Sequence, residues 1–382
     1  MTERGPIWRE PGMAPLALMT CAGFSGYALL LTVAPLWAVE GGAGTAGSGL
    51  VNGVLLLFTV LTQLLVPRAL DRFGWGAVLV AGLVLMGVPG MLYGVSDGLA
   101  TILALSALRG TGFGILTVTG SAAVAVLVEP ERRGEAIGVY GLAVALPNLV
   151  LLPAGPWIAD TLGFGWVFAL DVLPLVGIPA ALRLGSTLRA PSVEDDPIDV
   201  DQSVLRHLVR PILLLLAVTL AGGAVITFTP QAVDSPSIAA GGLFLMGLAA
   251  ALSRWRAGVL ADRHGAQRFV VPMVVLTGVA MAGVAWAVAA PSAPLFLGAM
   301  LVLGLCYGGL QNLTLLVSFA AVPPRQHNRA SAFWNIGFDA GTALGSVAVG
   351  VLAELTPFAT AFLVCGAIAA ATLPLALRRP RS

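Results

Sequence analysis

Three ionisable residues lie deep within long apolar stretches of this sequence, where charge is costly. They are Arg109, Asp171 and Asp339. A carboxylate that is removed from water favours its protonated form, so an aspartate at such a place can load and release a proton. We expect Asp339 and Asp171 to do this, whereas Arg109 keeps its charge and suits an anionic group of a substrate. The alternative is that Arg109 pairs with one aspartate and only neutralises its charge.

The composition indicates an integral membrane protein. Of the 382 residues, 58% are hydrophobic and only 10% are charged, whereas a soluble domain carries about 25% charged residues. Stretches of about 20 apolar residues suffice to cross a bilayer. We therefore expect an all-α fold with twelve transmembrane helices, at 13–38, 49–68, 76–95, 99–127, 135–158, 163–183, 210–231, 237–257, 268–289, 294–321, 330–353 and 358–378.

Arginine placement predicts how these helices are oriented. With twelve spans, every arginine except Arg109 falls on the side of the membrane that holds both termini. The positive-inside rule assigns that side to the cytoplasm. Arg254, near the end of the stretch 237–257, is placed with this group. We expect a multi-pass protein of the cell (inner or plasma) membrane with both termini cytoplasmic.

A short charged segment occurs twice, half a chain length apart. The copies are DRFG, from Asp71 to Gly74, and DRHG, from Asp262 to Gly265. A repeat at this offset predicts two like halves, a bundle at 1–183 and a second bundle at 210–382. The stretch 184–209 between them carries prolines and a run of acidic residues, which predicts a solvated cytoplasmic linker.

The duplicated segment resembles the GxxxDRxG signature of the major facilitator superfamily. The first copy has Pro67 where the family has glycine. The stretch ALRGTGFG, which contains Arg109, resembles the family's motif in the fourth span, and PERRGEAIGVYG resembles its loop after that span. The resemblance covers the whole chain and, within the family, is to bacterial twelve-span efflux members of the drug/proton antiporter type. The second copy of the turn fits the signature fully, at Gly258, Asp262, Arg263 and Gly265.

This resemblance implies a fold of two pseudo-symmetric six-helix bundles that open a central site to alternate sides of the membrane. It also implies that charges at the cytoplasmic ends of the helices form a gate, because they pair when that side closes. The alternative is that these charges only fix the orientation in the membrane. The expected gate residues are Asp71, Arg72, Arg132, Arg133, Asp262 and Arg263.

In this superfamily the first, fourth, seventh and tenth spans line the central cavity. Any single polar residue in a span also suits helix packing. So few charges favour a neutral or amphiphilic organic solute over a phosphate or a di-acid. The expected substrate contacts are Arg109, Thr111, Asn148, Gln311, Asn312 and Asn335.

We therefore predict a secondary active transporter, a proton-coupled exporter of small organic or amphiphilic compounds such as drugs or metabolites. An importer or facilitator of a neutral nutrient such as a sugar stays open, because no residue pattern encodes direction. A membrane enzyme is the third possibility, but no nucleophile with a base, metal-ligand set or phosphate loop falls at membrane depth. We expect a proton and a small molecule as partners within the bilayer, no cofactor, metal or nucleic acid, and a monomer.

Overall fold

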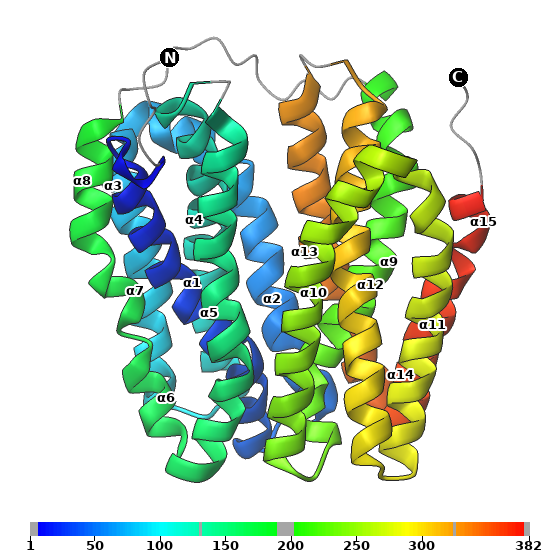
Figure 1. Cartoon of the computed structure of the whole chain (residues 1–382). Helices are drawn as coiled ribbons and strands as arrows, with labels where there is room; N and C mark the ends of the chain where they lie inside the picture. Colours follow the sequence, from blue (N-terminus) through cyan, green and yellow to red (C-terminus); the bar gives the residue numbers. More distant parts are fainter. Residues whose placement is uncertain (1–6, 130–131, 189–201, 324–325, 378–382) are drawn as a thin grey trace. The chain divides into compact units, whose positions relative to one another are not determined.

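The computed structural model describes residues 7–129, 132–188, 202–323 and 326–377. All secondary structure in this part of the chain is helical, as Figure 1 shows. Twelve spans in it are long and apolar enough to cross a membrane. The predicted all-α fold with twelve transmembrane helices is confirmed. Half of the expected linker 184–209, residues 189–201, lies outside the described residues.

The chain divides into two units, and the first comprises Met1–Gly42 and Val54–Glu194. Proline and glycine interrupt several of its spans, so the sixth span is built from three short helices. The helices of this unit are η1 (Ile7–Arg9), α1 (Met13–Glu40), α3 (Val66–Met91), η2 (Leu92–Val95), α4 (Leu99–Leu127), α5 (Arg133–Leu162), α6 (Phe164–Leu170), α7 (Leu173–Val176) and α8 (Ile178–Thr187), together with the second part of α2 (Thr45–Gln63).

The second unit comprises Ala43–Gly53 and Asp195–Ser382. Most of its spans are continuous helices, and the last span is divided by Pro374. Its helices are α9 (Gln202–Ala232), α10 (Pro236–His264), α11 (Gln267–Ala289), α12 (Ala293–Ala320), α13 (His327–Leu355), α14 (Phe358–Ala371) and α15 (Leu373–Leu377).

The stretch Ala43–Gly53 is held in the second unit by hydrogen bonds at the start of α2. Oε2 of Glu354 accepts from Thr45 Oγ1 at 2.8 Å and from the Ala46 backbone N at 3.0 Å. Asn52 Nδ2 donates to Thr227 Oγ1 at 2.9 Å. A carboxylate at a helix N-terminus is favoured by the free N–H groups there. The sequence repeat contains no signal for this assignment.

The duplicated charged segment has the same backbone geometry in both units. Gly74 has φ 74° and Gly265 has φ 83°, a region that other residues rarely adopt. The helix before the turn differs, because α10 runs without a break to His264 whereas α2 ends at Gln63 and a new helix begins at Val66. Pro67, in the first turn of α3, belongs to this interruption.

Close helix pairs recur in the two units. A Cβ at Gly114 of α4 would lie 2.6 Å from the backbone O of Thr59 in α2, and one at Gly308 of α12 would collide with the backbone O of Ala250 in α10. Small residues let membrane helices approach until their backbones touch. These contacts fix α4 against the second part of α2, and α12 against α10, and so position the polar side chains described next.

Candidate functional site

Arg109 is fully enclosed within the first unit. Its side chain is 0% exposed, and Nη2 donates to the backbone O of Gly26 in α1 at 2.8 Å. The guanidinium lies over the ring of Tyr93, 5.7 Å from its centroid, and the Tyr93 hydroxyl bonds Ser106 Oγ at 2.7 Å. Nε and Nη1 of Arg109 have no hydrogen-bond partner among the described residues.

Asp171 lies where the sixth span is broken, between α6 and α7. Pro174 stands in the first turn of α7, where its missing N–H is tolerated. The Asp171 carboxylate is 0% exposed, and neither oxygen has a hydrogen-bond partner within the described part of the chain. It sits against glycines of α1 and α3, so that a Cβ at Gly26 would approach Oδ1 to 3.0 Å and one at Gly90 would overlap Oδ2.

Arg109 and Asp171 interact electrostatically but not as a hydrogen-bonded ion pair. Among the described residues, the ion pairs at 4.0 Å or less involve Arg132 and not Arg109. The sequence alternative of a charge-neutralising pair fits this arrangement. Whether Asp171 also carries protons stays a prediction.

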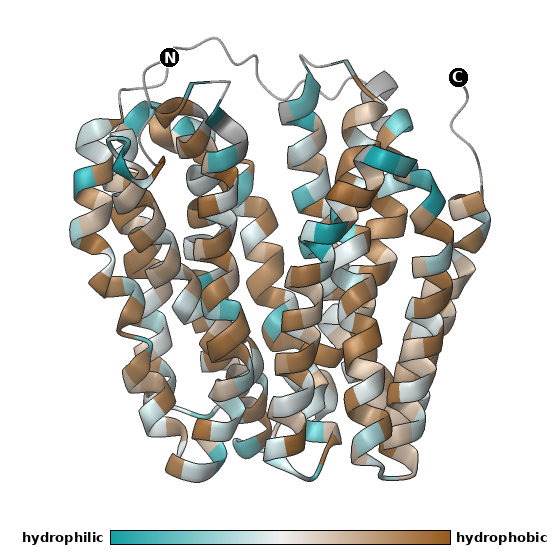
Figure 2. Cartoon of the chain, viewed as in Figure 1, coloured by the Kyte–Doolittle hydropathy of each residue, from teal (hydrophilic) through white to brown (hydrophobic). Residues whose placement is uncertain are grey.

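The second unit contains an arginine of a different kind, Arg254 of α10. It lies ten residues before the end of that helix, or about 15 Å along its axis. Its side chain is exposed. Nη2 donates to Oε1 of Gln311 in α12, and the Arg254 backbone O accepts from Asn312 Nδ2 at 2.8 Å. Figure 2 shows α10 as hydrophilic at its end and again farther along the helix.

Gln311 and Tyr307 extend this polar cluster along α12. Gln311 is 1% exposed, and its Nε2 has no acceptor at hydrogen-bonding distance in the described chain. Tyr307 lies beside Gln311 and beside Thr342 of α13. It is also close enough to Arg254 and to Asp339 to interact with both electrostatically.

Asp339 is buried in the middle of α13, with 5% of its surface exposed. Its carboxylate belongs to the same surroundings as Tyr307, and it shares α13 with Thr342, which is 3% exposed. The structure therefore brings together Asp339, predicted as a proton site, and Gln311, predicted as a substrate contact. We call Arg254, Tyr307, Gln311 and Asp339 the second-unit cluster.

Aromatic side chains adjoin the second-unit cluster. The rings of Tyr307 and Phe338 have centroids 6.3 Å apart, and those of Trp334 and Phe338 are stacked at 5.8 Å. Trp334 Nε1 donates to Thr314 Oγ1 at 3.1 Å, which orients the indole. The cluster thus combines one cation, one carboxyl group, an amide and an aromatic wall.

The other predicted contacts are satisfied within their own helices. Thr111 Oγ1 donates to the backbone O of Ala107 at 3.1 Å. Asn148 Nδ2 donates to Val144 O at 2.8 Å and Asn335 Nδ2 to Ser331 O at 3.0 Å. Such bonds to a preceding turn are ordinary for polar residues in helices. Their roles as substrate contacts stay predictions.

The predicted gate residues are only partly described. Asp71, Arg72 and Arg263 are exposed. Arg132 forms ion pairs with Glu10 and, at 3.0 Å, with Glu135. The side chains of Arg133 and Asp262 lie outside the described part of the structure. The gate role therefore stays a prediction.

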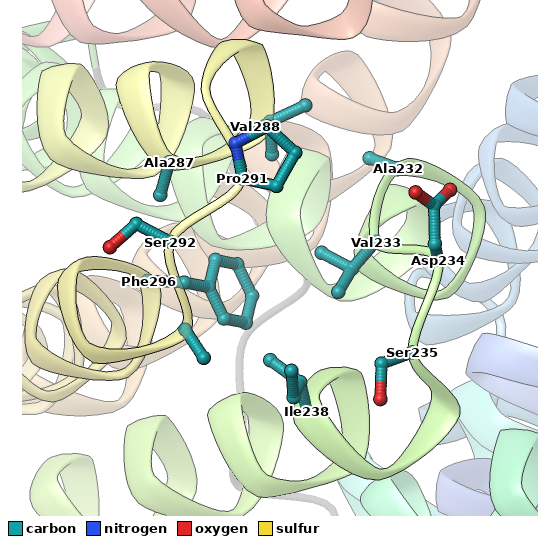
Figure 3. Close-up of a pocket in the computed structure, with 11 residues that line it drawn as sticks. Ala232, Val233, Asp234, Ser235, Ile238, Ala287, Val288, Pro291, Ser292 and Phe296 are labelled. Atoms are coloured by element: carbon teal, nitrogen blue, oxygen red, sulfur yellow. The ribbon is translucent and has the colours of Figure 1, made fainter.

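A small hollow lies elsewhere in the second unit, under the α9–α10 and α11–α12 connections. It has a volume of about 230 Å³ and is lined mostly by apolar groups, with Asp234, Ser235 and Ser292 at its edge. Figure 3 shows Phe296 and Ile238 among the residues that line it. It contains no member of the second-unit cluster.

Comparison with known proteins agrees with this architecture. The sequence model of the Major Facilitator Superfamily matches residues 16–318 and 234–382. The chain belongs to the major facilitator superfamily. The resemblance of the duplicated turn is thereby confirmed at the level of the family.

Several relatives in the superfamily are named as transporters, and one of them as an export protein. The staphylopine export protein of Staphylococcus aureus (strain Mu50) is 22% identical over 367 residues, covering 92% of this chain and 91% of that protein. The multidrug transporter protein MdtP of Bacillus subtilis (strain 168) is 26% identical over 180 residues, 46% of this chain and 33% of MdtP. An uncharacterised MFS-type transporter of Mycobacterium tuberculosis is 30% identical over 135 residues, which cover 35% of this chain and 23% of that protein.

Solved structures of other transporters share the fold. A bacterial homologue of the human lysosomal transporter Spinster, in its inward-facing and occupied conformation, superposes with a TM-score of 0.72 at 17% identity, covering 98% of this chain and 96% of that one. The nucleoside transporter NupG gives a TM-score of 0.72 at 11% identity, covering 96% and 99%. At these identities the likeness concerns the fold alone.

Two residues of the second-unit cluster, Arg254 and Tyr307, were not identified from the sequence. Arg254 was grouped with the arginines outside the bundle, because the apolar stretch was ended at residue 257. The helix continues through GVLADRH to His264 and the candidate span runs to Ala261, so Arg254 lies within that span and not at its end. Tyr307 lies in α12 four residues before Gln311, and this helical spacing is the signal that pairs them.

Proposed function

We propose that this protein is a proton-coupled exporter of small organic or amphiphilic compounds in the plasma membrane, with both termini in the cytoplasm. It is a secondary active transporter that works by alternating access. Asp339 loads and releases the coupling proton, with Asp171 as the second candidate. The predicted gate charges open and close the cytoplasmic side.

The position of Asp339 is the observation that supports this proposal most directly. A carboxyl group at membrane depth costs several kcal/mol if it stays charged, so binding a proton there is favoured. Asp339 is 5% exposed, and its neighbour Tyr307 links it to Arg254 and Gln311. A proton that binds next to the polar groups that contact a solute changes the affinity for that solute, and the solute changes the affinity for the proton by the same factor. The export named in the staphylopine relative supports the direction.

A transport assay with an imposed proton gradient tests the proposal. Compounds are first chosen by the growth protection that the protein confers on a sensitive host. Inside-out vesicles with an acidic lumen should then accumulate these compounds, and Asp339→Asn should abolish the gradient-driven part. Asp234→Asn, an exposed carboxylate outside the spans, is the matched control and should behave as the unaltered protein.

Two results would overturn the proposal. Gradient-driven accumulation that is unchanged in Asp339→Asn removes Asp339 as the coupling site. Net uptake of a neutral nutrient by intact cells, with no export of any compound in the panel, would favour the importer or facilitator instead.

A further inference from the structure

We propose that the second unit binds the carboxylate of an amphiphilic organic acid through Arg254 and Gln311. The aromatic side chains Tyr307, Phe338 and Trp334 contact the apolar body of the same molecule. This inference rests on the proposed export function and narrows its substrate class from organic compounds in general to organic anions.

The first argument concerns the cost of the Arg254 cation. Arg254 lies seven residues before the end of the candidate span Pro236–Ala261, or about 10 Å along the helix. An arginine within a span is favoured where it faces protein or a water-filled space. Arg254 faces α12 and donates to Gln311, but the acceptor is a neutral amide. No carboxylate of the described residues lies within 4.0 Å of its guanidinium. The cation is therefore held in place without a counter-ion of its own.

The second argument concerns unused hydrogen-bonding capacity. A guanidinium carries five N–H groups in a planar fork that suits a carboxylate. Among the described residues, the Arg254 guanidinium donates one hydrogen bond, to Oε1 of Gln311, and its side chain is exposed. Its other N–H groups are therefore available to a ligand. Gln311 is 1% exposed, yet its Nε2 lacks an acceptor in the described chain. A buried donor without a partner costs about 1–3 kcal/mol. The Tyr307 side chain lies beside this amide, so we expect Gln311 to orient Arg254 and Tyr307 around the bound carboxylate.

The third argument concerns the body of the ligand. Tyr307, Phe338 and Trp334 form a run of ring contacts with centroids 6.3 Å and 5.8 Å apart. Tyr307 and Trp334 are only partly buried. Aromatic faces next to a fixed cation match a molecule with a carboxylate at one end and a flat or apolar body at the other.

Arg109 shows why this assignment belongs to the second unit. Arg109 is 0% exposed, lies over Tyr93 and interacts with Asp171. Its charge has a counter-charge nearby and no accessible edge. Arg254 is exposed and has no carboxylate of the described residues within 4.0 Å of its guanidinium, so an anion can approach it.

The test uses matched compounds and the purified full-length protein in detergent. Naphthylacetate, indolebutyrate and phenylbutyrate are each compared with their primary amides and with the corresponding amines. The shift of the thermal unfolding midpoint with concentration gives an apparent Kd for each compound. We expect the carboxylates to bind at least about tenfold more tightly than their amides, because a charge-assisted hydrogen bond adds roughly that much.

Three variants identify the residues involved. Arg254→Gln should weaken carboxylate binding about tenfold or more while leaving amide binding unchanged, and Arg254→Lys should lose less because it keeps the charge. Gln311→Glu is isosteric and supplies its own carboxylate to Arg254, so it should abolish the preference for carboxylates. Arg256→Gln is the control, since Arg256 is exposed and lies over Trp255 instead.

The possible outcomes separate the inference from the function on which it rests. Carboxylates that shift the unaltered protein no more than their amides do, or that shift Arg254→Gln equally, overturn the anion site even if proton-driven export is found. Stabilisation by phosphatidylglycerol micelles alone would assign the site to a lipid headgroup and also overturn it. Arg254-dependent carboxylate binding without any gradient-driven transport would keep the site and overturn the proton-coupled export.

Discussion

Arg109 in the first unit and Arg254 in the second are both arginines inside membrane-spanning helices, yet their surroundings are opposite. Arg109 is fully enclosed, is bonded to a backbone carbonyl and interacts with the buried Asp171. Arg254 is exposed and is bonded to a buried amide. In a low dielectric, an enclosed pair neutralises itself, whereas an open cation attracts a mobile anion. We therefore propose that the enclosed charges have a structural role and that the second-unit cluster binds the substrate and the proton.

The largest effect is expected from breaking the enclosed pair. Arg109→Met removes a positive charge that interacts with the buried Asp171, and it also removes the hydrogen bond to the backbone O of Gly26. Each of these losses costs about 1–3 kcal/mol of folding free energy. The thermal unfolding midpoint in detergent should fall sharply. Adding Asp171→Asn to Arg109→Met should restore part of the loss, because the buried charge is then gone. A midpoint for Arg109→Met equal to that of the unaltered protein would contradict the structural role of this pair.

A smaller effect is expected from filling the space beside Asp171. The Cβ of Gly90→Ala would overlap Oδ2 of Asp171, and displacing a packed group typically costs about 1–3 kcal/mol. Gly141→Ala in α5 is the control, since no atom lies within 4 Å of its Cβ position. The two variants are compared by thermal unfolding. Equal midpoints for both variants would mean that Asp171 is not fixed against α3.

The duplicated turn has the same backbone geometry in the two units, in contrast to the two arginines. Gly74 and Gly265 both have positive φ and an open Cβ position. Alanine at either site must adopt a strained backbone, at a cost of about 1–3 kcal/mol. Gly74→Ala and Gly265→Ala should therefore lower the unfolding midpoint by similar amounts. A large difference between them would show that the turns serve the two units unequally.

The fold was predictable because its signals are additive. Apolar stretches, arginine placement and the repeat of DRxG each extend over many residues and point to the same twelve-helix arrangement. Arg109, Asp171 and Asp339 were identifiable because each interrupts an apolar stretch. Hydropathy also places Arg254 near the end of the apolar stretch 237–257. It does not indicate that the helix α10 continues to His264. It likewise contains no signal that Glu354 bonds Thr45 and Ala46.

The local surroundings of each charge were beyond sequence reasoning. Whether an arginine is enclosed or open depends on which glycines and rings pack around it. Gly26, Gly90 and Tyr93 surround the first-unit pair, and they come from α1, α3 and η2. Gln311 and Tyr307 face Arg254 from α12. Such contacts between distant segments are set by tertiary packing rather than by local pattern.

The most direct test is to measure proton release when a transported compound binds to purified protein. A compound found by growth protection is added to the protein in weakly buffered detergent solution, and a pH-sensitive dye reports protons. If Asp339 in the open cluster couples transport, Asp339→Asn should release no proton, whereas Asp171→Asn should release as many as the unaltered protein. Proton release that persists in Asp339→Asn would contradict this account, and its loss in a folded Asp171→Asn would assign the coupling proton to the second candidate instead.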